Sequence, residues 1–223
     1  MASVSVAKAK GAGPGTLLSA CVAEHGSAAH PYFVSPTLVT GADSARNLAD
    51  AVHFLCALHG RHPGIIDLAG GRVIDPAARA WLNAAIEGVG IERAYLTRLA
   101  VAVGPVPSTP GGAGSEAAVL AQRSALATLA QSDRKGCALG AALAFAADWE
   151  PIRRLLDSVA QRVGIEVPPC RIGEEAELRP VADAGVDSPG TERALLFGAQ
   201  QLALQHRGLW DLLEARQQAR LDY

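Results

Sequence analysis

Apolar residues recur at intervals of three and four along most of the chain, a spacing that predicts amphipathic helices. The clearest example begins after Asp43, a good N-cap, and ends before Gly60. At about 100° per residue, four of its side chains fall within about 60° of one another. They are Leu48, Val52, Leu55 and His59. We therefore expect a helix over residues 44–59 whose last residue, His59, points toward the core.

A second long helix is predicted at the end of the chain, opening at Ser188-Pro189 and reaching about Arg220. Its apolar positions alternate by steps of four and three, the spacing of a bundle seam. The seam consists of Leu195, Ala199, Leu202, His206, Leu209 and Leu213. His206 lies in the middle of these aliphatic residues, so its imidazole needs a hydrogen-bonding partner from another helix.

The middle of the chain shows clear helix boundaries. Asp75-Pro76 combines an N-cap with proline at the first helical position. Gly88 and Gly90 weaken the helix that follows, so we expect a second helix at an angle to it over 91–103. A further helix is expected from Ser115 to about Gln131, by the same apolar spacing.

The uncharged run 136–147 predicts a buried core helix, because it is far shorter than the roughly 20 residues that span a bilayer. Pro151 is expected to kink or restart this helix before Gly164 ends it. Two segments rich in proline and glycine, 104–114 and 167–190, are predicted to be flexible loops.

Together these elements predict an all-α fold, a single-domain helical bundle of seven to nine helices with a long Pro-rich loop before the last long helix. A flexible tail is expected at 1–15 and the domain at 16–223. The composition agrees, since 49% of the residues are hydrophobic but only 4% are aromatic. The core must therefore be built from Ala, Leu and Val, a mixture that suits closely packed helices.

Charge and cysteine content limit the classes of function. A formal net charge of −2 provides no electrostatic footprint for nucleic acid. The four cysteines form no C-x-x-C pair, which favours reduced thiols and a cytoplasmic location. The excess of Arg over Lys, together with abundant Ala, is typical of GC-rich bacterial genomes. We therefore expect a bacterial, cytoplasmic protein that binds neither nucleic acid nor membrane.

Four polar residues on predicted core faces of four different helices are the primary candidates for ligand or metal binding: His206, His59, Asp148 and Glu92. Side chains on facing helices are how bundle interiors build such sites. Each also has a purely structural interpretation. His206 could be a hydrogen-bonded core histidine, and Asp148 could cap the helical turn that Pro151 restarts. His59 and Glu92 could complement helix dipoles at a last and a first turn.

The secondary candidates are His53, Asp50 and His62. Asp50 and His53 have the D-x-x-H spacing, but they are expected on the exposed face of the 44–59 helix. A ferritin-like site needs two Glu-x-x-His pairs, so iron chemistry of that kind is disfavoured. His62 precedes Pro63 and is expected in a turn.

Two hypotheses for function follow. In the first, an interior polar pocket binds a small ligand or a metal, with enzymatic activity left open. In the second, the protein is a non-catalytic scaffold that forms a homodimer through the Leu195 to Leu213 seam. The chain has no G-x-S-x-G elbow and no phosphate-loop Gly-Lys-Ser/Thr, and no motif specifies a cofactor.

Overall fold

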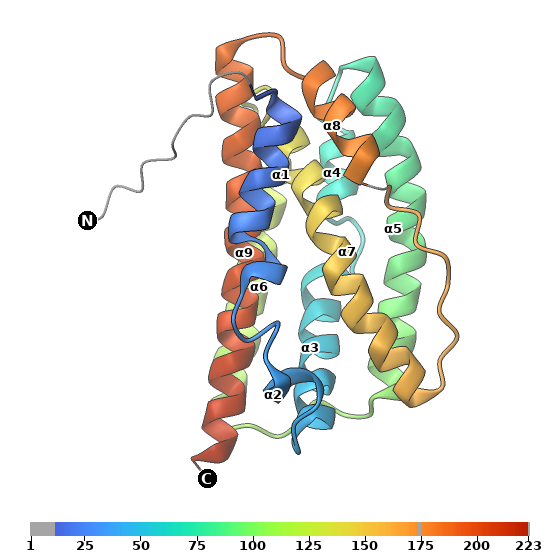
Figure 1. Cartoon of the computed structure of the whole chain (residues 1–223), viewed down its shortest axis with the longest axis vertical. Helices are drawn as coiled ribbons and strands as arrows, with labels where there is room; N and C mark the ends of the chain where they lie inside the picture. Colours follow the sequence, from blue (N-terminus) through green and yellow to red (C-terminus); the bar gives the residue numbers. More distant parts are fainter. Residues whose placement is uncertain (1–11, 174, 223) are drawn as a thin grey trace, which may run out of the picture.

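The computed structural model describes residues 12–173 and 175–222, and these form nine α-helices, one short 3-10 helix and no strand (Figure 1). The all-α bundle predicted from the sequence is therefore confirmed. The helices are α1 (Pro14–His25), η1 (Ser27–Ala29), α2 (Pro36–Val39), α3 (Ser44–His59), α4 (Ile65–Gly70), α5 (Pro76–Ala102), α6 (Gly112–Ala130), α7 (Cys137–Val163), α8 (Glu175–Ala184) and α9 (Pro189–Leu221).

Several predicted boundaries agree with the structure. α3 spans the predicted residues, and α5 begins where Asp75 Oδ1 accepts a hydrogen bond of 2.9 Å from the Ala78 amide. α9 begins where Ser188 Oγ accepts a bond of 3.1 Å from the Thr191 amide. The tail predicted at 1–15 falls largely on residues 1–11, which lie outside the described residues. α1 already begins at Pro14, because proline suits the first helical position.

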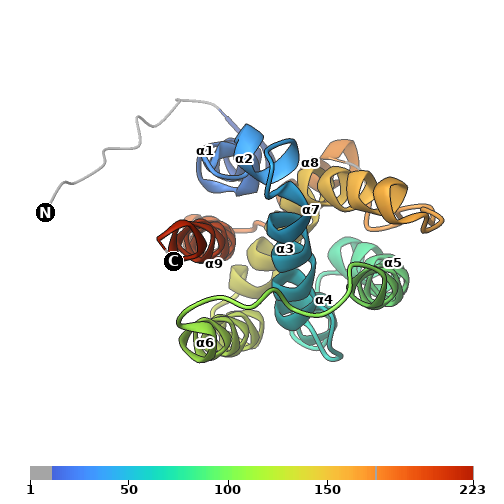
Figure 2. The same cartoon turned by 90° about the horizontal axis from the view of Figure 1, so that it is seen from below.

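α3 lies in the middle of the bundle when it is viewed along its long axis, with α5, α6, α7 and α9 around it (Figure 2). α7 and α9 run side by side and form the main helix pair. Their backbones approach closely because glycine occupies the contact on each helix. A Cβ at Gly140 would overlap the carbonyl oxygen of Leu195, and one at Gly198 would overlap that of Cys137.

The apolar seam of α9 is buried inside the subunit. Each of its six residues is at most 1% exposed. Since other helices of the same chain already cover this face, the seam is not available for the dimer that the scaffold hypothesis requires. Within the described ranges, no helix combines the length and the apolar character needed to cross a membrane.

The prediction of two helices around Gly88 and Gly90 is wrong, because α5 is continuous over 27 residues. Gly88 has a packing role instead. A Cβ there would overlap the carbonyl oxygen of Arg171, so glycine lets the segment before α8 lie directly on α5.

α7 also continues through Pro151, which neither ends nor restarts it. Trp149 and Ile152, on either side of the proline, are each 1% exposed, so core packing holds both halves in one helix. The predicted loop 167–190 contains α8, whose Leu178 and Ala182 are buried one turn apart. The expectation of an unbroken loop there is therefore wrong. In the other predicted loop, residues 104–111 precede α6, and their flexibility stays a prediction.

Candidate functional site

The Asp148 cluster, formed by Ser27, Asp148 and His206, lies where η1, α7 and α9 meet. Asp148 Oδ2 accepts hydrogen bonds from His206 Nδ1 at 2.6 Å and from Ser27 Oγ at 2.7 Å. Asp148 Oδ1 accepts a third from the Ser27 amide at 2.7 Å. A Cβ at Gly26 would overlap this carboxylate oxygen, so glycine is required next to it. Asp148 is thus the centre of a buried cluster in mid-helix, and the prediction that it caps a turn restarted by Pro151 is wrong.

The carboxylate fixes both the orientation and the tautomer of His206. Because Nδ1 carries the proton that Asp148 accepts, Nε2 is left as an acceptor in the neutral ring. That nitrogen is enclosed by protein and has no hydrogen-bond partner. A buried acceptor without a partner costs about 1 to 3 kcal/mol. Two of the predicted candidates, His206 and Asp148, are therefore brought into direct contact, and one ring nitrogen of the pair stays unsatisfied.

His59 lies beside His206 in a cluster of rings. The two imidazole centroids are 5.0 Å apart with the ring planes at 77°, an edge-to-face arrangement. Phe145 and Trp149 complete the cluster, at centroid distances of 5.1 and 5.8 Å from His59. The two imidazoles are not hydrogen bonded to each other, and Nε2 of His59 is also enclosed without a partner.

His59 also forms part of the wall of a cavity of about 240 Å³ between the ends of α3, α4 and α6, which we call the His59 cavity. At about 30 Å³ per molecule, this volume equals that of about eight waters. The lining is mostly apolar, with Arg123 and Gln131 as the other polar side chains. The full lining is Leu58, His59, Pro63, Gly64, Ile65, Leu68, Arg123, Leu126, Ala127 and Gln131.

Burial lowers the pKa of His59 well below its usual 6.5, and the nearby His206 and Arg93 lower it further. At neutral pH the ring is therefore uncharged, with one nitrogen as donor and the other as acceptor. His59 ends α3, where a protonated imidazole would be favoured by the helix dipole. Because burial outweighs that effect, the dipole interpretation of His59 is not supported.

Glu92 occupies a separate cluster. It lies in the middle of α5, 1% exposed, so the prediction that it complements the dipole at a first turn is wrong. Its carboxylate accepts hydrogen bonds from Trp149 Nε1 at 3.0 Å and from Arg153 Nη1 at 2.6 Å. Burial raises the pKa of Glu92, and these two partners partly offset that effect. The Trp149 ring contacts both Glu92 and His59.

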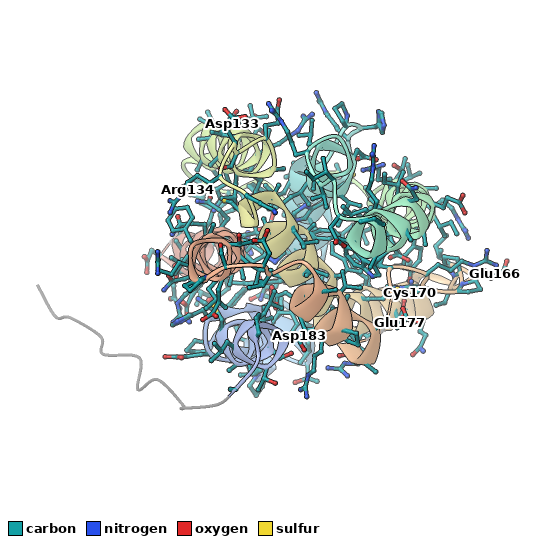
Figure 3. The ribbon with its side chains drawn as sticks, turned by 90° about the horizontal axis from the view of Figure 1, so that it is seen from above. Asp133, Arg134, Glu166, Cys170, Glu177 and Asp183 are labelled. Atoms are coloured by element: carbon teal, nitrogen blue, oxygen red, sulfur yellow. The ribbon has the colours of Figure 1, made fainter. Side chains whose placement is uncertain are left out.

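A larger cavity of about 790 Å³ lies beyond this cluster, between α7 and the segment that leads into α8. Arg153 and Cys170 line it. Figure 3 shows Cys170 and Glu177 on the α8 side of the molecule, well separated from Arg134 at the turn before α7. The four cysteines are free; Cys137 is buried, and Cys170 is exposed.

Asp50 is buried, 1% exposed, and the prediction that its face of α3 is exposed is wrong. The reason is the central position of α3, which is covered on more than one side (Figure 2). Arg216 donates to Asp50 from Nε at 3.2 Å and from Nη2 at 2.9 Å, and Arg220 also pairs with it. Arg220 further donates to Asn47 Oδ1 at 2.6 Å and, with Arg216, to Thr109 Oγ1. We call these five residues the Asp50 cluster.

The remaining secondary candidates do not join the Asp148 cluster or the Asp50 cluster. His53 contacts the carbonyl oxygen of Gly104 through Nε2 at 2.8 Å. The side chain of His62 is 71% exposed, and its Nε2 lies 3.7 Å from Asp67. Across residues 12–173 and 175–222, no three His, Cys, Asp or Glu side chains gather in a group that could hold a metal ion.

Sequence reasoning missed Ser27, Arg123 and the two arginines of the Asp50 cluster. For the arginines a signal was present, because Arg216 and Arg220 continue the alternating three and four spacing of the α9 seam beyond Leu213. Ser27 reaches Asp148 across 121 residues of sequence, and no local pattern marks such a contact.

Comparison of the chain with curated proteins and with solved structures finds no match. A model of a protein family matches residues 22–221. This range includes the Asp148 cluster, the Asp50 cluster and the whole lining of the His59 cavity. The chain therefore belongs to a family of unknown function, DUF6975.

Proposed function

We propose that the protein binds a small organic molecule in the His59 cavity, with the His59 imidazole as the polar contact that orients it. The observation that carries this proposal is the combination of burial and incomplete bonding at His59. The ring lines the cavity, is 7% exposed, and makes no hydrogen bond within the described residues. Ligand sites are typically concave and mostly apolar, with a few placed polar groups, and this cavity has that character.

The cavity is somewhat smaller than the roughly 300 to 1,000 Å³ typical of drug-sized ligands. It therefore suits a compact molecule with one polar end. A resident metal is not favoured, because the described residues provide no group of three ligands. The unpaired nitrogens of His59 and His206 carry a cost in folding free energy, and binding sites commonly sacrifice stability in this way.

Fragment screening by NMR tests the proposal. Fragments should perturb the backbone amide signals of cavity residues such as Leu58 and Leu126. In His59→Leu, the Kd of the fragments that make a polar contact should rise about tenfold, the equivalent of one hydrogen bond to the imidazole. His25→Gln is the matched control, since His25 lies at the end of α1 and does not line the cavity.

Two results would overturn the proposal. In one, the fragments that bind perturb only signals outside the cavity. In the other, His59→Leu keeps the wild-type spectrum away from the cavity and binds the same fragments with unchanged Kd.

A further inference from the structure

The charges around the His59 cavity indicate which class of molecule it takes. Arg123 is the one lining residue with a formal charge at neutral pH, because the lining contains no acidic side chain and His59 is neutral. In the described ranges Arg123 has no ion pair or hydrogen bond, and its side chain is partly buried. Partly buried arginines normally pair with a carboxylate or a carbonyl, so a guanidinium left unpaired beside a cavity favours an anion within it.

Arg93, another cation close to His59, does not compete for that anion. Its guanidinium pairs with Asp67, whose side chain is 8% exposed, and the pair is neutral overall. Asp67 is also tied to its own helix, since Oδ2 accepts a bond of 2.7 Å from the Gly64 amide. Asp67 is therefore not free to move toward Arg123.

The helix ends that border the cavity disfavour an anion there, but more weakly than Arg123 favours one. α3 and α6 both end there, and helix C-termini carry a partial negative charge. Part of that charge is already compensated, because the Gly60 amide donates to Cys56 and the Gln131 amide donates to Ala127. Arg123 carries a full charge on a flexible side chain and can approach a ligand directly.

The rest of the lining fits an apolar body. Leu58, Ile65 and Leu126 are buried, at 4%, 6% and 3% exposed, and form an apolar wall of the cavity. We infer that the His59 cavity takes a small organic monoanion, a carboxylate with a compact apolar body, whose charged end pairs with Arg123 and whose body packs on this wall. This inference rests on the proposed function and adds the chemical class of the ligand.

Titration with matched probes followed by NMR tests the inference. Benzoate and hexanoate are the anionic probes, benzamide and hexanamide are their uncharged counterparts, and benzylamine is a cation of similar shape. In the wild type, each carboxylate should perturb the cavity amides with a Kd at least about tenfold below that of its amide. Benzylamine should not bind there.

The same titration in two variants locates the effect. Arg123→Gln should remove the preference for the carboxylates. Arg46→Gln should keep it, because Arg46 is an exposed arginine in the first turn of α3, about 20 Å along the helix from His59.

The remaining outcomes contradict the inference, and one of them also contradicts the proposed function. If amides and carboxylates bind the cavity equally and Arg123→Gln changes nothing, or if benzylamine binds best, the inference fails and the proposed function stands. The same holds if none of the five probes binds there while other screened fragments do. If no compound of any class perturbs the cavity amides, both fail.

Discussion

The Asp50 cluster and the Asp148 cluster have similar parts, but their hydrogen bonds are completed to different degrees. Asp50 and Asp148 are each 1% exposed, each lies within a long helix, and each is bound by residues of α9. In the Asp50 cluster, both carboxylate oxygens are paired with guanidinium groups that bond further to Asn47 and Thr109. In the Asp148 cluster, the carboxylate is equally well bonded, but His206 Nε2 has no partner.

This difference indicates which cluster is structural. A buried polar network that is fully satisfied rigidifies a core, and the Asp50 cluster joins α3, α9 and the segment before α6 in that way. Within the described residues six buried side-chain atoms have no hydrogen-bond partner, and two of them are the Nε2 atoms of His59 and His206. A buried atom left in this way calls for an explanation, of which a binding role is one. The Asp148 cluster, next to His59 and its cavity, is thus the better place to look for binding. Three predictions test this contrast.

The largest effect is expected in the Asp50 cluster. Asp50→Ala would leave Arg216 and Arg220 buried without their carboxylate, and removing one partner of a buried ion pair costs about 3 to 5 kcal/mol. Urea denaturation would measure the loss in free energy of unfolding. Asp43→Ala is the control, since Asp43 is exposed and its side chain makes no cap hydrogen bond, so a change below about 0.5 kcal/mol is expected. A loss below about 1 kcal/mol for Asp50→Ala would remove the contrast between the clusters.

An intermediate effect is expected from the titration of His59. Since its folded-state pKa lies well below 6.5, the unfolded chain binds one more proton than the folded chain at pH values between the two. The contribution of this pKa difference to the free energy of unfolding is fully present above pH 6.5. Below that value the wild type should lose about 1.4 kcal/mol of free energy of unfolding per pH unit, until the folded-state pKa is reached. His59→Leu should lack this slope. Denaturation of both proteins from pH 8 to pH 5 measures it, and parallel curves throughout would contradict the neutral state assigned to His59.

The smallest effect is expected from His206→Leu. Asp148 would keep both hydrogen bonds from Ser27, and the substitution would remove the unpartnered Nε2, so the free energy of unfolding should change by about 1 kcal/mol or less. Leu202→Ala in the same seam is the comparison, with an expected loss of about 2 to 5 kcal/mol. A loss of that size for His206→Leu would show that the histidine is a structural element like those of the Asp50 cluster.

Helical periodicity was sufficient to predict most of the fold, because most helices bury one main face and the local spacing of apolar residues identifies it. The predictions failed where a contact distant in sequence decided the outcome. From local sequence Gly88 is predicted to break the helix, yet its lack of a side chain lets the segment at Arg171 pack directly on α5. From local sequence Pro151 is predicted to kink or restart the helix, yet one helix continues through it and the residues on either side are packed in the core.

The candidate site was predicted in part for the same reason. His59 and His206 lie on faces that periodicity identifies as buried, and the structure places them side by side. Asp50 was assigned to an exposed face because one apolar stripe was assumed per helix, which does not hold for a helix in the middle of a bundle. Arg123 could not be singled out from the sequence, because it is distinguished by the absence of a pairing partner within the described residues.

The glycine contact between α7 and α9 also limits which substitutions this chain can accept. Gly140 and Gly198 each precede a residue of the Asp148 cluster by eight positions, Asp148 on α7 and His206 on α9. Along a helix this is about 12 Å, so the same two parallel helices that touch at their backbones meet again as a hydrogen-bonded pair. A methyl group at either glycine would separate the helices and carry His206 away from Asp148. The hydrogen bond between Asp148 and His206 therefore depends on two residues that have no side chain of their own.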